Sequence, residues 1–237
     1  MLTGVFGAAP STSGSTNYTH AYTIANTNQH QSLSIRLQDP NINVDFALAM
    51  IDKLELSVEP EGIAEYTASF RSKAGVDTTT DVPSFTALGN VFNHSHCVVK
   101  LAANTAGLAA ASALSLTSLK LNITKNVQDF NDMGSVTLSE IVNKNFVVDG
   151  TIELGYSDQV YRDLMLAGSS KAMSITFTYG TNNSLSFTMP KLRFEDWSPK
   201  KPTDDIATQS IKFIAQYDAA NAASMLSASL KNQVTSY

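Results

Sequence analysis

The segment SLSIRLQDPNINVDFALAMIDKLELSVEPEGIAEYTASF (Ser32–Phe70) decides the fold, because apolar and polar residues alternate over most of its length. Leu54, Leu56 and Val58, for example, are separated by single polar residues. Successive side chains of a strand point to opposite faces of the sheet, so this spacing predicts strands with one buried face. The second face is left for water or for a partner.

The same alternation recurs along the rest of the chain, so the fold class predicted is mainly β. Only one segment, residues 158–167, has helical spacing. Ser157 or Asp158 can serve as the N-cap of this helix, and Gly168 ends it. The expected architecture is a sheet structure with one short flanking helix. The other alternating segments are residues 33–37, 64–70, 119–123, 146–154, 173–177, 185–189, 192–194 and 211–217.

An internal repeat is the second organising feature of the chain. The segment Ser174–Tyr217 aligns with the quoted one, since both run through a strand, a polar turn and a strand that ends in Met followed by Lys-Leu-x-Leu or Lys-Leu-x-Phe. We therefore predict two tandem β units, residues 1–103 and 113–237, joined by a linker of small residues at 104–112.

The two predicted units differ at their starts. The second unit opens with a strand pair, Leu114–Asn126 and Asn145–Tyr156, ahead of its helix, whereas the first opens at what resembles a helix end. The first unit is thus expected to lack its leading hairpin. Either the chain is shortened at its start or another subunit supplies those strands.

Composition argues against several classes of protein. Charged residues make up 16% of the 237 residues, against about 25% in typical soluble domains. The net charge of −5 and the absence of any Lys/Arg cluster disfavour a nucleic-acid-binding protein. A single cysteine cannot form an internal disulfide, and no segment reaches the roughly 18 apolar residues of a membrane helix.

Two clusters of polar residues are candidate reactive sites. His94, His96 and Cys97 have a spacing that could hold a metal, but on a strand the two histidines would share one face and the cysteine the other, and a metal needs three or four converging ligands. The loop around Trp197 carries Glu195, Asp196, Asp204 and Asp205, which fit a solvated turn better than an acid–base pair. We expect no enzyme and no cofactor. A metalloenzyme and a carbohydrate-binding or adhesin-type β-sandwich remain the rivals.

The segments YTHAYTIANTNQHQSLSIRLQDP, ALAMIDKLELSVEPEGIAEYTASFRSK and SLKLNITKNVQDF, in this order, resemble the tail tube proteins of long-tailed bacteriophages. The resemblance runs through nearly the whole chain. It implies a β-sandwich or barrel with a flanking helix, whose copies form stacked rings around a tape measure protein, with tail terminator and tail-tip proteins at the two ends. DNA would then pass through the lumen without specific binding. The same fold in a tailocin or another contractile injection system stays open.

The resemblance also implies a location and a set of contact residues. The protein would be assembled in the bacterial cytoplasm and end in the virion, as rings of three chains with pseudo-sixfold symmetry or of six chains. The hairpin within residues 114–156 is the candidate inner wall, with Lys120, Asn122, Thr124, Asp149, Thr151 and Glu153 facing the lumen. Two long polar loops, residues 71–90 and 125–140, are the candidate contacts between rings. Within them we select Val76, Asp77, Thr78, Thr79, Thr80, Asp81, Asp129 and Asp132, and expect a chain without Val76–Asp81 to fold but not to stack.

Overall fold

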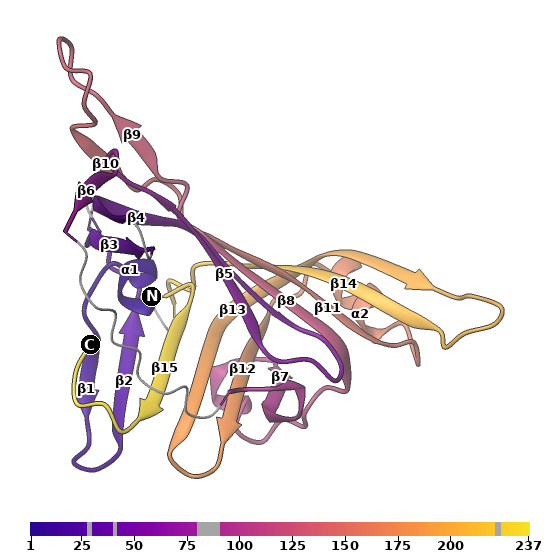
Figure 1. Cartoon of the computed structure of the whole chain (residues 1–237). Coiled ribbons are helices and arrows are strands. Elements are labelled where there is room, and N and C mark those ends of the chain that lie inside the picture. Colours follow the sequence, from indigo (N-terminus) through magenta and orange to yellow (C-terminus); the bar gives the residue numbers. More distant parts are fainter. Residues whose placement is uncertain (28–29, 40–41, 80–90, 221–223) are drawn as a thin grey trace.

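Antiparallel strands make up most of the structure, a computed structural model that describes residues 1–27, 30–39, 42–79, 91–220 and 224–237 (Figure 1). In these residues thirteen strands form one connected sheet, and two more pair separately. The prediction of a mainly β fold is confirmed. The strands are β1 (Ser11–Ser13), β2 (Tyr18–Thr23), β3 (Leu33–Gln38), β4 (Asn43–Val58), β5 (Glu65–Arg71), β6 (Val76–Thr78), β7 (Cys97–Ala102), β8 (Leu116–Thr124), β9 (Gln128–Phe130), β10 (Glu140–Val142), β11 (Val147–Gly155), β12 (Lys171–Tyr179), β13 (Asn183–Lys200), β14 (Thr208–Ala215) and β15 (Ser227–Asn232).

The long strands β4 and β13 each change partner strands along their length. The first half of β13 pairs with β12 and β15, and its second half, from Leu192, pairs with β14. Strand β4 behaves alike: up to Ala49 it pairs with β3, and from Met50 it pairs with β5 and then β8. Both strands therefore change partners close to the Met-x-x-Lys-Leu or Met-Pro-Lys-Leu segment at which the two repeats align.

Two layers of strands face each other across the core. The first layer contains β7, β12, β13, β15, β2 and β1, and the second layer contains β13, β14, β11, β8, β4 and β5. Their inward side chains form one contiguous apolar cluster, in which each large side chain contributes about 1.5–3 kcal/mol by leaving water. Its members include Met173, Phe177 and Phe187 of the first layer and Leu121, Ile152 and Phe213 of the second, none more than 2% exposed.

Gly150 allows the strands of the second layer to approach closely. A Cβ at this position would lie 2.4 Å from the carbonyl oxygen of Lys120 and 2.5 Å from Cζ of Phe213. The Phe213 ring therefore packs directly over the backbone of β11. A larger residue at Gly150 would push β14 and β8 away from this strand.

The predicted helix is present but shorter at both ends. It runs from Val160 to Leu166 as α2, because the Asp158 carboxylate accepts the backbone N–H of Val160 at 3.1 Å and forms a turn before the helix. The Tyr161 ring packs edge-on against the Phe194 ring, with their centroids 5.8 Å apart. Val160, the first residue of the helix, is 53% exposed. The remaining helices are α1 (Leu2–Phe6) and the 3-10 turns η1 (His94–His96) and η2 (Thr105–Gly107).

Strand β2, near the start of the chain, lies beside β15, the last described strand. Strand β15 fits between β13 and β2, and both termini lie at the same side of the molecule (Figure 1). His20, fully buried on β2, is held between the Thr12 hydroxyl and the carbonyl oxygen of Val234, each at 2.9 Å. The buried imidazole thus has a partner on each ring nitrogen, which satisfies the requirement that buried polar groups be hydrogen-bonded.

Candidate functional site

The second layer carries a continuous polar face on the side away from the core. Along β8 and β11 the exposed or half-buried residues alternate with buried ones, as the sequence predicts. The two strands pair in register, with Asn122 opposite Asp149 and Lys120 opposite Thr151. The structure therefore places all six predicted lumen residues on one face, namely Lys120, Asn122, Thr124, Asp149, Thr151 and Glu153.

Neighbouring strands supply charged residues to the same face that the sequence alone did not single out. Lys53 and Glu55 of β4 form an ion pair, and the Lys53 ammonium lowers the pKa of the Glu55 carboxyl. The register of β4 places Glu55 opposite Asn122, whose side-chain amide donates to Asp149 at 3.0 Å. Only the strand order, which puts β4 beside β8, identifies these residues.

Further pairs of opposite charge lie on this face. The Lys200 ammonium lies 3.0 Å from the Glu153 carboxylate. Glu195 lies 3.9 Å from Arg193 and 3.8 Å from Lys212. Exposed pairs contribute only about 0–1 kcal/mol each to folding, so their main effect is to prevent a strong field of either sign on the face.

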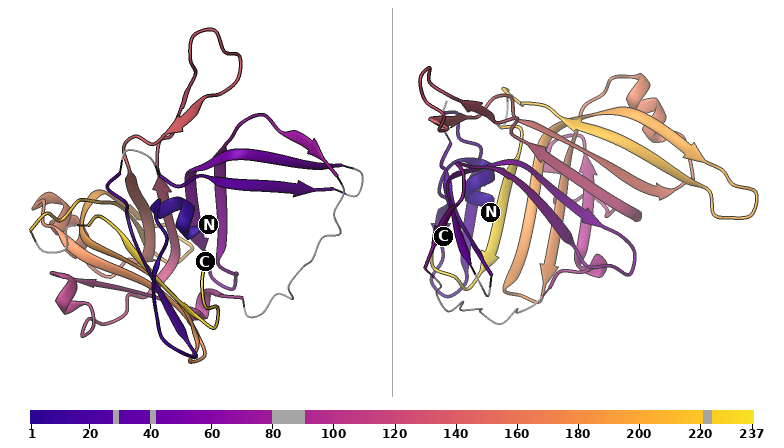
Figure 2. Two further views of the ribbon diagram at one scale, coloured as in Figure 1. Left: turned by 90° about the vertical axis from the view of Figure 1, so that its left-hand side faces the viewer. Right: turned by 45° about the horizontal axis from the view of Figure 1, so that its top comes forward.

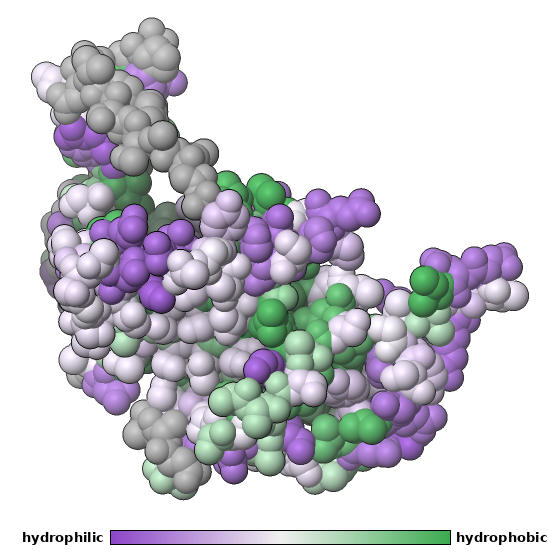
Figure 3. Space-filling view, turned by 90° about the horizontal axis from the view of Figure 1, so that it is seen from below, coloured by the Kyte–Doolittle hydropathy of each residue, from purple (hydrophilic) through white to green (hydrophobic). Residues whose placement is uncertain are grey.

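Both edges of the second layer are open in the described part of the chain. From Glu65 onward β5 pairs only with β4, and from Arg193 onward β13 pairs only with β14. Beside the β5 edge, Ile63 and Tyr66 are 55% and 63% exposed. The view from below shows further apolar surface gathered near the middle of the molecule (Figure 3). Unpaired strand edges of this kind are templates for pairing with another chain.

A hairpin built on β9 and β10 stands away from the body (Figure 2). Met133 and Val136 near its tip are fully exposed, although both are apolar. The tip is ordered by its own polar groups, among them the Ser139 hydroxyl, which donates to the Asp132 carboxylate at 2.7 Å. Asp129 at the base lies 3.4 Å from Arg71 of β5. Two predicted contact residues, Asp129 and Asp132, thus stabilise the hairpin rather than mark its most exposed points.

The other predicted contact loop is partly a strand. Val76–Thr78 form β6, which pairs with the start of β4, and the buried Asn43 donates to the carbonyl oxygen of Thr79 at 3.0 Å. Deleting Val76–Asp81 would therefore remove a partner strand of β4, and the expectation that the shortened chain folds stays a prediction. Thr80 and Asp81 lie outside the described residues.

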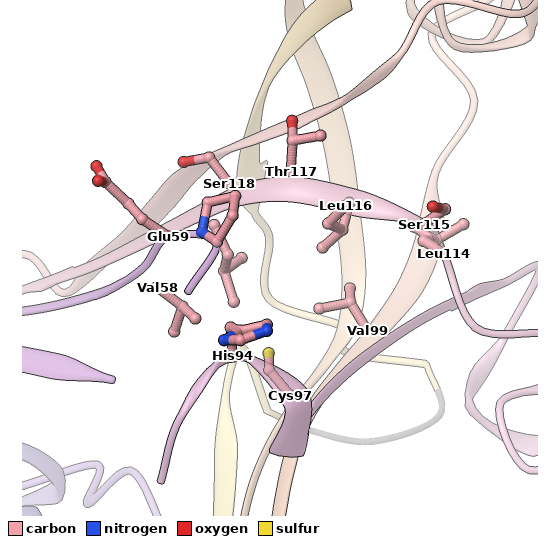
Figure 4. Close-up of a pocket in the computed structure, with 12 residues that line it drawn as sticks. Val58, Glu59, His94, Cys97, Val99, Leu114, Ser115, Leu116, Thr117 and Ser118 are labelled. Atoms are coloured by element: carbon pink, nitrogen blue, oxygen red, sulfur yellow. The ribbon is translucent and has the colours of Figure 1, made fainter. Parts of the chain in front are cut away.

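His94, His96 and Cys97 do not share the strand that was expected. The histidines lie in the turn η1, because the Asn93 side chain accepts the backbone N–H of Ser95 at 3.1 Å and His96 Nδ1 accepts the N–H of Asn93 at 3.2 Å. His94 and Cys97 line a pocket of about 250 Å³ beside β8 (Figure 4). Burial raises the pKa of the Cys97 thiol to about 11, which keeps it protonated and unreactive at neutral pH.

The remaining predicted features have structural roles. Trp197 donates through Nε1 to the side chain of Gln209 at 2.9 Å and so anchors the β13–β14 hairpin. In the residues that the structure describes, no three His, Cys, Asp or Glu side chains come close enough to hold a metal ion. Within the same residues no helix has the length and apolarity needed to span a membrane.

A family model described as phage tail tube protein matches residues 1–215. The chain belongs to this family. The tail tube protein is also similar to the PVC sheath/tube terminator of an extracellular contractile injection system in its extended state. That similarity has 13% identity and a TM-score of 0.43 over 55% of this chain and 96% of the other, too slight to transfer any role. No curated protein matches the sequence.

Proposed function

We propose that this tail tube protein is the repeating subunit of the hollow tail tube of a long-tailed phage. Copies form rings, the rings stack around the tape measure protein, and DNA later passes through the lumen. The tail terminator and tail-tip proteins bind the two ends of the stack, which is assembled in the bacterial cytoplasm and ends in the virion. The observation that carries the proposal is a six-stranded layer with one polar face and two open edges in a chain of this family.

Rings close, in this proposal, through the open edges of the second layer. The β5 edge of one copy pairs with the Arg193–Lys200 edge of the next, because two different edges joined head to tail generate a ring. The polar face then becomes the inner wall, lined by the residues around Asn122 and Asp149. Its paired charges support free passage of DNA, since an unpaired basic wall would bind phosphates and slow them.

Three chains to a ring is the stoichiometry that we favour. The proposed units at 1–103 and 113–237, with their linker at 104–112, each contain one long strand that changes partners near a Met, β4 or β13. The second unit contributes β8, β11, β14 and the end of β13 to the wall, and the first contributes β4 and β5. This likeness supports pseudo-sixfold rings of three chains over true sixfold rings.

Stacking is assigned to the end of the molecule that carries the β9–β10 hairpin. Figure 1 places this hairpin, β6 and β3 together at one end. The exposed apolar tip residues Met133 and Val136 fit contacts with an adjacent ring, because such side chains gain stability when a partner covers them.

Negative-stain electron microscopy of the purified full chain, concentrated and then diluted, tests the proposal. We expect rings or hollow tubes whose end views have threefold symmetry. Class averages with sixfold symmetry throughout would replace three chains by six and leave the tube role intact. Uniform monomers at every concentration would contradict self-assembly of this chain.

A further inference from the structure

Lys125 is a buried cation without a described counterion. Its side chain is 1% exposed, and its ammonium group donates to the carbonyl oxygen of Gly4 in α1 at 2.8 Å. An ammonium group has three donors, so this bond leaves two of them for other acceptors. The backbone carbonyl of Asp52 accepts the N–H of Lys125, while the Asp52 carboxylate accepts the N–H of Val127 at 2.9 Å and lies 4.0 Å from Arg71.

His30 is a second buried basic group beside it. The imidazole is 5% exposed and packs on Gly7, where a Cβ would lie 2.3 Å from its Cγ. Its Nε2 lies 3.0 Å from the carbonyl oxygen of Ala25 and therefore carries the proton, while Nδ1 is buried and has no hydrogen-bond partner in the described residues. Burial and the adjacent Lys125 both lower the pKa of the imidazole.

Both basic groups line one pocket of about 480 Å³, together with residues 24–27 on one side and residues 142–144 and Phe146 on the other. Lys144 lies at the same pocket, and the described lining residues include no Asp or Glu. Asn143 positions the segment, since its side-chain oxygen accepts the backbone N–H of His30 at 3.1 Å. A chain with a net charge of −5 thus has a cavity whose ionisable groups are all basic.

We propose that this pocket binds an oxyanion, a tetrahedral anion such as sulfate or phosphate or a carboxylate, between Lys125 and His30. The oxyanion accepts the free ammonium donors of Lys125. On binding, His30 takes one proton from solvent at Nδ1 and donates it in a hydrogen bond to the anion, which gives the orphaned nitrogen a partner. Charge balance explains why the cation is tolerated at this depth: the buried ammonium acquires the counterion that buried charges require.

The geometry leaves two sources for the oxyanion, a free ion or a carboxylate of a second copy. The site is defined within one chain and does not depend on ring formation, so its test is separate from that of the tube. Because one proton is taken up, affinity for a sulfate ion should tighten by up to about tenfold for each pH unit lost around the His30 titration.

The test is an NMR titration of the imidazole signals of the full chain at low protein concentration. Sodium sulfate is added against sodium chloride of equal ionic strength, at pH 6, 7 and 8. We expect a saturable shift of His30 alone among the four histidines, tighter at pH 6 than at pH 8. The shift should be lost in Lys125→Met and kept in Lys231→Met, whose exposed ammonium donates to the Thr181 carbonyl in a similar way.

A protein concentration series without sulfate separates the two sources. A His30 shift that grows with protein concentration and disappears in Lys125→Met identifies a carboxylate of a second copy. If Lys125→Met does not fold, hydrogen exchange provides the second test. Sulfate should protect the 142–146 amides of the unaltered protein from exchange and should protect those of His30→Gln less. A linear, non-saturating response to sulfate together with no concentration dependence would overturn the site.

Discussion

Lys125 shows at the residue scale how burial links charge to stability. Burial lowers its pKa from 10.5 to about 8, so between these values the folded chain binds fewer protons than the unfolded chain and stability rises with pH. The shift corresponds to a cost of roughly 3 kcal/mol at neutral pH. In chloride buffer we expect Lys125→Met to be about 2 kcal/mol more stable than the natural chain at pH 7, after loss of one hydrogen bond.

Urea unfolding at pH 7, 8 and 9 measures this difference. It should shrink above pH 8, as the natural ammonium loses its proton in the folded state. The Cys97 thiol, whose pKa is raised in the folded chain, lowers the stability of both proteins as it titrates in the unfolded chain, so its contribution cancels in the difference. A difference that stays constant with pH would contradict a buried, titrating Lys125.

Gly150 gives a second prediction at the same scale. Gly150→Ala inserts a methyl group against the Lys120 carbonyl and the Phe213 ring and should cost about 1–3 kcal/mol in the free energy of unfolding. Gly155→Ala, at the end of the same strand and with no atom within 4 Å of the new methyl group, is the matched control. Equal stability of the two variants would show that β8, β11 and β14 are less tightly packed than described.

At the scale of the element, the β9–β10 hairpin is the contact that can be altered without changing the body. We expect Met133→Ser combined with Val136→Ser to form rings that do not stack, with stability within about 0.5 kcal/mol of the natural chain. Leu166→Ser, an equally simple loss of an exposed apolar side chain on α2, should leave tubes unchanged. Electron microscopy and thermal melting compare the three proteins. Tubes of normal length from the hairpin variant would remove it from the contact between rings.

Elements also differ in how far the sequence could predict them. Strand β8 follows directly from the alternation at Leu119–Ile123, since its core is a local period-two pattern. The turn at His94 was missed because a side-chain cap, not periodicity, decides it. The pocket that Lys125 and His30 both line depends on long-range packing, and the sequence near either residue does not indicate it. The polar residues of β4 that share a face with those of β8 and β11 were not predicted, because local alternation does not determine strand order.

At the scale of the whole molecule, the first layer depends on its last strand. Removing residues 217–237 takes β15 from between β13 and β2 and uncovers their buried side chains, so cooperative unfolding should be lost. Removing only residues 233–237 takes away the Val234 carbonyl that His20 contacts and should cost about 1–2 kcal/mol. Calorimetry of both truncations tests this. A sharp transition in the longer truncation would show that the first layer is stable without β15.

The position of β15 also determines when a newly made chain can complete its first layer. A ribosome delivers β2 early and β15 after every other described strand, yet the two must pair before the first layer is closed. While translation continues, β2 has no partner on the side that β15 later occupies. The second layer then faces an incomplete first layer. In the proposed tube, the subunit would reach its assembling form only after synthesis has passed Asn232, which would keep half-made chains out of growing polymers.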